Sequence, residues 1–192
     1  GVNPITGIYQ FADKNGNPTS SPDYSTDRTV FIDVNPVFYG GLQNSFKYED
    51  FNLDFLLQFV KQKAFGNQFG GDPGAFLGNQ PISVLSHWQN QGDEVNVQKF
   101  SANGSLSEAV GNIRSSDANW SDASYIKLKN LAVSWQLPKQ LKSYFHLENC
   151  KLYIQGENLF TITGYDGLDP ETKSFVSIPP LRVITFGVKI GL

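Results

Sequence analysis

The fold class is decided by the stretch Phe38-Tyr-Gly-Gly-Leu-Gln-Asn-Ser-Phe-Lys-Tyr48 and, after Glu49-Asp50, by Phe51-Asn-Leu-Asp-Phe-Leu-Leu-Gln-Phe-Val60. Successive side chains of a β-strand point to opposite faces, so every second residue shares a face. In the second half, one face is wholly apolar and consists of Phe51, Leu53, Phe55, Leu57 and Phe59. The pattern predicts a tight hairpin with one aromatic-rich apolar face and one mostly polar face.

The same alternation recurs further along the chain. We expect strands at about 37–48, 51–61, 124–137, 151–163 and 181–192, and a sixth stretch at 8–13 alternates less clearly. A change of phase around Asn130 predicts a β-bulge, which moves side chains between faces. Short helical pieces are expected near Ile82–Gln89 and Leu106–Ile113.

The expected strands have about 10 to 13 residues, whereas strands of soluble proteins usually have about 5 or 6. A membrane-spanning β-strand needs about 9 to 11 residues. The connections alternate in length, since Glu49-Asp50 and 138–150 are short while about 62–122 and 164–180 are long. Short turns on one side and long loops on the other are typical of an outer-membrane barrel. We therefore expect an all-β fold, with antiparallel strands of a transmembrane β-barrel and long extracellular loops.

Composition and motifs exclude several classes of function. The chain has a net charge of −3 and 14% aromatic residues, which is not a disordered composition. No basic run is present, so nucleic acid is not expected as a partner. Cys150 is the one cysteine, and His87 and His146 lack metal-ligand spacing. No nucleophile elbow, phosphate-binding loop or dinucleotide motif occurs, so we expect neither an enzyme nor a cofactor.

Five strands cannot close a barrel, because known barrels start at about eight strands. The sequence also contains no methionine. We therefore expect residues 1–192 to be a fragment or a processed product of a larger protein, with Gly1 not the point where translation begins.

Several stretches together resemble the C-terminal end of the SusC/RagA family of TonB-dependent outer-membrane transporters. They are Asn35–Phe55, Ser124–Pro138, Leu152–Thr163, Gly164–Glu171 and Pro180–Leu192. The resemblance covers most of the chain apart from the long loop. One departure is Leu192, where outer-membrane barrels commonly end in an aromatic residue.

The resemblance implies a barrel of 22 strands with an N-terminal plug, of which residues 1–192 would be the last strands. It implies energised import of glycans or oligopeptides across the bacterial outer membrane. A SusD-like surface lipoprotein would cap the barrel, and TonB would couple through a segment absent from this chain. A soluble all-β carbohydrate-binding or adhesion domain is the alternative, and a siderophore transporter would share the barrel.

Three aromatic residues are candidates for contact with an oligosaccharide or oligopeptide substrate, namely Trp88, Trp120 and Tyr165, because they lie in expected extracellular loops. Exposed aromatic faces suit stacking with sugars or peptides, although loop packing or anchoring at the membrane interface would use the same residue types. Asp166, Asp169 and Glu171 are expected to be solvated loop charges.

The run Asp13-Lys-Asn15-Gly-Asn17-Pro18 places oxygen ligands at alternate positions, as the start of a calcium loop does. The EF-hand pattern needs Gly at the sixth position and Glu at the twelfth, where this chain has Pro18 and Tyr24. A polar turn is the preferred interpretation, with Asp13, Asn15 and Asn17 as weak metal-ligand candidates.

The alternation also predicts which face meets lipid. Lys127 and Lys129 are expected to point into the lumen, as are Lys189 and Thr185, because a lysine facing lipid at the bilayer midplane costs about 2–4 kcal/mol. The lipid face of the last strand is expected to carry Ile184, Phe186, Val188, Ile190 and Leu192.

Overall fold

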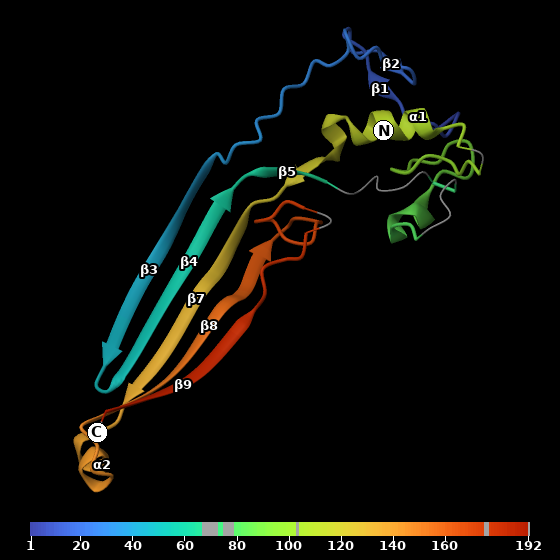
Figure 1. Ribbon diagram of the computed structural model, residues 1–192. Coiled ribbons are helices and arrows are strands. Elements are labelled where there is room, and N and C mark those ends of the chain that lie inside the picture. The colour runs from blue at the N-terminus through green and yellow to red at the C-terminus, as the bar shows by residue number, and fades with distance from the viewer. Residues whose placement is uncertain (67–72, 75–78, 103, 175–176, 192) are drawn as a thin grey trace. The chain divides into compact units, whose positions relative to one another are not determined.

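The chain forms two compact units in a computed structural model that describes residues 1–66, 73–74, 79–102, 104–174 and 177–191 (Figure 1). The strand unit comprises Asn35–Lys63 and Asp122–Leu192, and the loop unit comprises Gly1–Val34 and Ala64–Ser121.

The strand unit is a five-stranded antiparallel sheet with the order β3-β4-β7-β8-β9 (Figure 1). Its strands are β3 (Phe38–Tyr48), β4 (Phe51–Lys61), β7 (Tyr125–Gln136), β8 (Asn149–Thr163) and β9 (Val183–Gly191). Leu192, at the end of the expected last strand, lies outside the described residues. The long strands and their uniform antiparallel pairing confirm the expected all-β fold class.

A short helix that alternation does not predict, α2 (Lys139–Tyr144), lies between β7 and β8. It begins directly after Pro138, whose φ of −59° lies in the narrow range that the proline ring imposes and that suits the start of a helix. None of its residues is buried, so α2 is a surface connection between two strands.

A register shift in the middle of the sheet explains the change of phase seen in the sequence. Leu56 pairs with Asn130 but Leu57 pairs with Leu128, so Lys129 is the extra residue of a β-bulge in β7. Because of this extra residue, the apolar side chains before and after Lys129 all lie on the same face of the sheet. These residues are Ile126, Leu128, Leu131, Val133 and Trp135.

The loop unit contains short elements around one small core. Its elements are β1 (Phe11–Ala12), β2 (Pro18–Thr19), η1 (Ile82–Ser86), α1 (Ser107–Arg114) and η2 (Asp117–Asn119). Two further strands, β5 (Lys63–Phe65) and β6 (Trp120–Asp122), pair where the chain passes between the units. No described helix is both long and apolar enough to cross a membrane.

The core of the loop unit joins segments that are far apart in the sequence. Helix α1 buries Ala109, Val110 and Ile113 against Tyr9, and Val2, Ile8 and Phe11 pack against this cluster. The expected long loop at 62–122 is therefore not a free-standing connection, because Ala64–Ser121 forms one compact unit with Gly1–Val34 and α1 shares its core with Tyr9.

Candidate functional site

One face of the sheet is apolar and exposed to the surroundings. Residues that pair across antiparallel strands lie on the same face, and two neighbouring rows run through all five strands. These rows are Tyr48, Phe51, Trp135, Leu152 and Val188, and then Phe46, Leu53, Val133, Ile154 and Phe186. Phe186 is 75% exposed and Val188 is 58% exposed. An apolar face of this size that no described segment covers has the character of a surface made for contact with another apolar phase.

The opposite face is polar. Lys189 pairs with Lys151, which pairs with Gln136, and Thr185 pairs with Gln155. The expected facing of β9 is therefore observed: Lys189 and Thr185 share the polar face, and the apolar face carries Ile184, Phe186, Val188 and Ile190. Leu192, expected on the apolar face, is not among the described residues.

A buried charge cluster lies on this polar face, near the end of the sheet where β7 begins. Lys127 Nζ lies 3.1 Å from Asp169 Oδ2 and 2.7 Å from Glu171 Oε2, and Lys129 Nζ binds Glu171 Oε1. The side chain of Lys127 is only 3% exposed and that of Asp169 is 9% exposed. The two ammonium groups and two carboxylates balance in charge, which is what burial of ions requires.

The carboxylates of this cluster come from the loop between β8 and β9, which we call the strap where it runs from Tyr165 to Lys173 (Figure 1). Asp169 shapes the strap, because its Oδ1 accepts hydrogen bonds from the backbone N–H groups of Glu171 and Thr172 at 2.8 and 3.1 Å. Gln62 donates from Nε2 to the carbonyl oxygen of Pro170 at 2.7 Å and to that of Ala123 at 3.3 Å. The strap is thus bonded to the sheet through both charged and neutral groups.

The pKa of the Glu171 carboxyl reflects two opposing effects. Burial alone would raise this pKa, but the hydrogen bonds and charges of Lys127 and Lys129 lower it below its ordinary value. Glu171 is therefore ionised at neutral pH and holds both lysines.

The expectation that the acidic residues of this loop are solvated is wrong for two of the three. Asp166 is exposed, but Asp169 is buried and Glu171 is half-buried in the ion pairs. A partner 42 or 44 residues away in the chain leaves no local signal, so sequence spacing alone could not have found these pairs.

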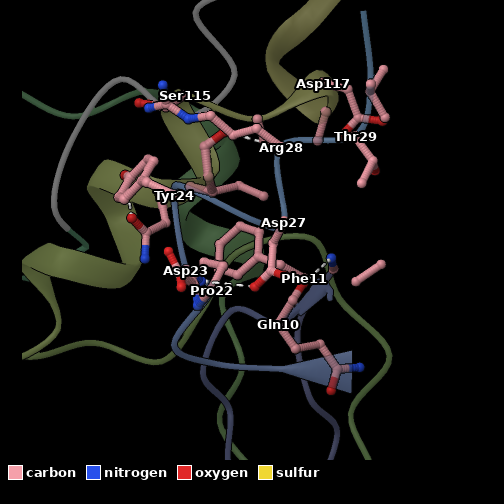
Figure 2. Close-up of a pocket in the computed structure, with 17 residues that line it drawn as sticks. Gln10, Phe11, Pro22, Asp23, Tyr24, Asp27, Arg28, Thr29, Ser115 and Asp117 are labelled. Atoms are coloured by element: carbon pink, nitrogen blue, oxygen red, sulfur yellow. Dashed lines mark hydrogen bonds between the residues drawn. The ribbon is translucent and has the colours of Figure 1, made fainter. Parts of the chain in front are cut away.

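The loop unit contains a separate pocket of about 520 Å³ (Figure 2). One wall comes from Gly1, from Gln10–Ala12 and from residues between Pro22 and Val30, and the other comes from the end of α1 and from η2. The side chains labelled in the close-up are Gln10, Phe11, Pro22, Asp23, Tyr24, Asp27, Arg28, Thr29, Ser115 and Asp117. The lining mixes apolar, hydroxyl, amide and charged groups, which suits a polar organic solute better than a lipid.

Tyr24 and Arg28 lie against each other in this pocket. The guanidinium carbon of Arg28 lies 4.3 Å from the centre of the Tyr24 ring, a cation–π contact that orients its donors. The Tyr24 hydroxyl donates to Oδ1 of the buried Asn112 on α1. Asp23 and Asp27 use carboxylate oxygens on nearby backbone N–H groups, which stabilises the loop that carries Tyr24.

Two of the aromatic candidates lie in the loop unit. Trp88 donates from Nε1 to the carbonyl oxygen of Pro4 at 3.0 Å, and its ring covers Gly7, where a Cβ would come within 2.4 Å of the ring. Trp120 packs edge-on against Phe65 with ring centres 5.6 Å apart. Both rings thus take part in packing of the loop unit.

The third aromatic candidate, Tyr165, begins the strap in the strand unit and is only 7% exposed. Its ring covers Gly167, and burial, followed by the nearby charge of Asp166, raises the pKa of its hydroxyl. Neither Trp88, Trp120 nor Tyr165 lines the pocket of Figure 2.

Asp13, Asn15 and Asn17 form a tight turn between β1 and β2. The backbone N–H groups of Asn15 and Asn17 both donate to Asp13 Oδ1 at 2.8 Å, and Asn17 Nδ2 donates to Asp13 Oδ2 at 3.3 Å. The N–H of Asn17 and then that of Asn15 lower the pKa of the Asp13 carboxyl. Within the described residues no group of three or more His, Cys, Asp or Glu side chains is placed to hold a metal ion.

Similar proteins were found by sequence and by structure, although no protein-family model matches the chain. The TonB-dependent receptor P3 of Formosa agariphila is 26% identical over 195 residues, a match that covers 94% of this chain and 18% of the receptor. The solved RagAB peptide transporter superposes with a TM-score of 0.79 at 20% identity over 99% of this chain. The RagAB peptide importer in its open-open state gives a TM-score of 0.76 at 19% identity over 100% of this chain.

The chain spans about a fifth of the length of these proteins, since it covers 18% of the receptor and 21% of each RagAB chain. The sequence match and the shared fold agree with each other over nearly all of the chain. They support the resemblance noted in the sequence, and the solved structures show the same fold.

Proposed function

We propose that this chain forms part of the wall and outer mouth of a nutrient importer, as the C-terminal strands of a SusC/RagA-type TonB-dependent outer-membrane transporter, which it resembles in sequence and fold. In this proposal the strand unit supplies five wall strands. Its apolar face contacts outer-membrane lipid and its polar face lines the lumen. The loop unit and the strap belong to the extracellular side.

One observation carries the proposal: the aromatic and aliphatic face of the sheet is exposed while the charged residues point the other way. A lipid-facing strand needs this arrangement, because a charged side chain in the hydrocarbon costs about 2–4 kcal/mol. In a soluble β-sandwich the apolar face would be packed against a second sheet. The exposed Phe186 and Val188 thus favour a membrane barrel over a soluble carbohydrate-binding or adhesion domain.

The partners follow from the same proposal. A SusD-like surface lipoprotein would cap the mouth, and TonB would energise import. The structural relatives are described as peptide importers, and on that ground an oligopeptide is one substrate class and an oligosaccharide the other. No catalytic step is assigned to the chain.

Within the mouth, the Tyr24–Arg28 pocket is the best-defined place for a polar substrate to bind. The oriented guanidinium offers hydrogen-bond donors, and the lining hydroxyl and amide groups suit either substrate class. Trp88, Trp120 and Tyr165 are secondary candidates, since each ring has a packing role that explains it without a substrate.

Membrane fractionation of the full-length protein that carries these residues, followed by native mass spectrometry, tests the proposal. We expect recovery in the outer membrane, in a complex with a surface lipoprotein. Recovery in the soluble fraction would overturn the proposal. Recovery in the outer membrane without a lipoprotein would overturn only the proposed lipoprotein partner.

A further inference from the structure

We propose that the strap, residues Tyr165–Lys173, is a fixed lining of the lumen wall that Lys127 holds in place, and that the movements of the mouth during import leave it bound to the sheet. This inference rests on the proposed function for the meaning of "lumen" and "import". The attachment itself is a property of the strand unit alone.

Lys127 is buried beneath the strap. Its strand position places it in the row of Gln58 and Thr161 on the polar face, where the strap covers it. A lysine at this depth needs its counter-ions, because an unpaired charge in a buried site is strongly unfavourable. Release of the strap would take both Asp169 and Glu171 away from the ammonium group.

The strap is bonded to the sheet at several points and is also held in shape by bonds of its own. Asp169 uses one carboxylate oxygen on Lys127 and the other on the N–H groups of Glu171 and Thr172. Its carbonyl oxygen accepts from the N–H of Lys173 at 3.1 Å. Gln62, which is 5% exposed, binds the carbonyl oxygen of Pro170. A lid that opens in each cycle would have to break the bonds that Lys127, Lys129 and Gln62 make to the strap all together, whereas the bonds within the strap only keep its shape.

The strap also changes which charges the wall presents to a passing solute. Lys127 is covered, whereas Lys129 and Glu171 are about one quarter exposed and remain paired with each other. The strap therefore replaces a bare ammonium group on the wall by a neutral ion pair. Lys127 acts as a positioning residue, because it would influence import only through the strap.

Hydrogen exchange measured by mass spectrometry on the full-length transporter in detergent tests this inference. In the native protein, the N–H groups of Glu171, Thr172 and Lys173 should be protected. In Lys127→Met, exchange of the peptide that covers 165–173 should be at least about 100-fold faster, since the substitution leaves the buried Asp169 carboxylate without its lysine and Glu171 with Lys129 alone.

The chain offers a matched control. Lys61 and Asp122 form an ion pair at 2.6 Å in the same unit, but their side chains are 47% and 60% exposed. Lys61→Met should leave exchange in the strap unchanged, because exposed pairs contribute little. Lys127→Arg, which keeps the charge, should restore most of the protection.

Three results would overturn the inference: an unprotected strap in the native protein, equal exchange in Lys127→Met and Lys61→Met, or an increase in native strap exchange when an oligopeptide or oligosaccharide substrate is added. The first and third need no variant, so the inference stays testable if Lys127→Met does not assemble. Failure of outer-membrane fractionation would refute the proposed function, whereas a mobile strap in a correctly located transporter would refute only this inference.

Discussion

The sheet predicts a large asymmetry between two neighbouring substitutions on β9. Phe186→Lys places an ammonium group on the apolar face, where the native side chain is 75% exposed, whereas Thr185→Lys places it on the polar face that already carries Lys189. The cost of a lysine on the lipid face near the midplane is about 2–4 kcal/mol. This corresponds to a decrease of roughly 30- to 1000-fold in the folding equilibrium, and Thr185→Lys should change it by less than about tenfold.

The assay is equilibrium unfolding of the full-length transporter in lipid vesicles, with urea as the denaturant. Phe186→Ala is the control for loss of the aromatic side chain, so the difference between the alanine and lysine variants isolates the charge. Equal destabilisation by Phe186→Lys and Thr185→Lys would refute the assignment of the two faces. A stable Phe186→Lys variant together with an unstable Thr185→Lys variant would mean that the faces are reversed.

Three further substitutions test the loop unit and an exposed ion pair. Gly7→Ala should destabilise the loop unit by more than about 1 kcal/mol, because Gly7 has a φ of +69° and the new Cβ would collide with the ring of Trp88. Thermal unfolding measures this loss of stability. Gly16→Ala is the control that separates backbone strain from the collision, because Gly16 has a φ of +84° with open space around it. Tyr24→Phe should cost about 1–3 kcal/mol, since it leaves Oδ1 of the buried Asn112 without this donor; an unchanged melting temperature would contradict that hydrogen bond. Asp122→Asn should cost less than about 1 kcal/mol at pH 7, because the side chain is exposed. The hydrogen bond from a lysine lowers the pKa of Asp122 to about 2 from its ordinary 3.8, so this contribution is present above pH 3.8 and is lost as pH falls through about 2; a contribution that grows on acidification would refute the pairing.

The strands could be predicted from the sequence because alternation is a local property of a strand with one apolar face. The alternation of apolar and polar residues from Phe51 to Phe59 and from Val183 to Ile190 predicts which face each side chain lies on. The phase change near Asn130 predicts the bulge, whose extra residue in the structure is Lys129. The helix α2 was missed because six residues with no buried member carry too short a helical period to detect.

The candidate sites depended on contacts between distant segments and could be predicted only in part. The core of the loop unit joins Tyr9 to Ile113, and Tyr24 meets Asn112 across 88 residues. Asp169 and Glu171 looked like ordinary loop acids because their lysines lie on another strand. The facing of Lys127 was predicted correctly, but the two carboxylates that pair with it were not.

The central claim is that the apolar face of the sheet contacts lipid, and spin labels placed one at a time at residues 184–190 of the full-length protein in vesicles test it most directly. Each label is measured for collision with oxygen, which concentrates in lipid, and with a water-soluble nickel complex. The account predicts a period of two, with Ile184, Phe186, Val188 and Ile190 accessible to oxygen and the residues between them accessible to nickel. Uniform access to nickel, or an alternation of opposite phase, would contradict it.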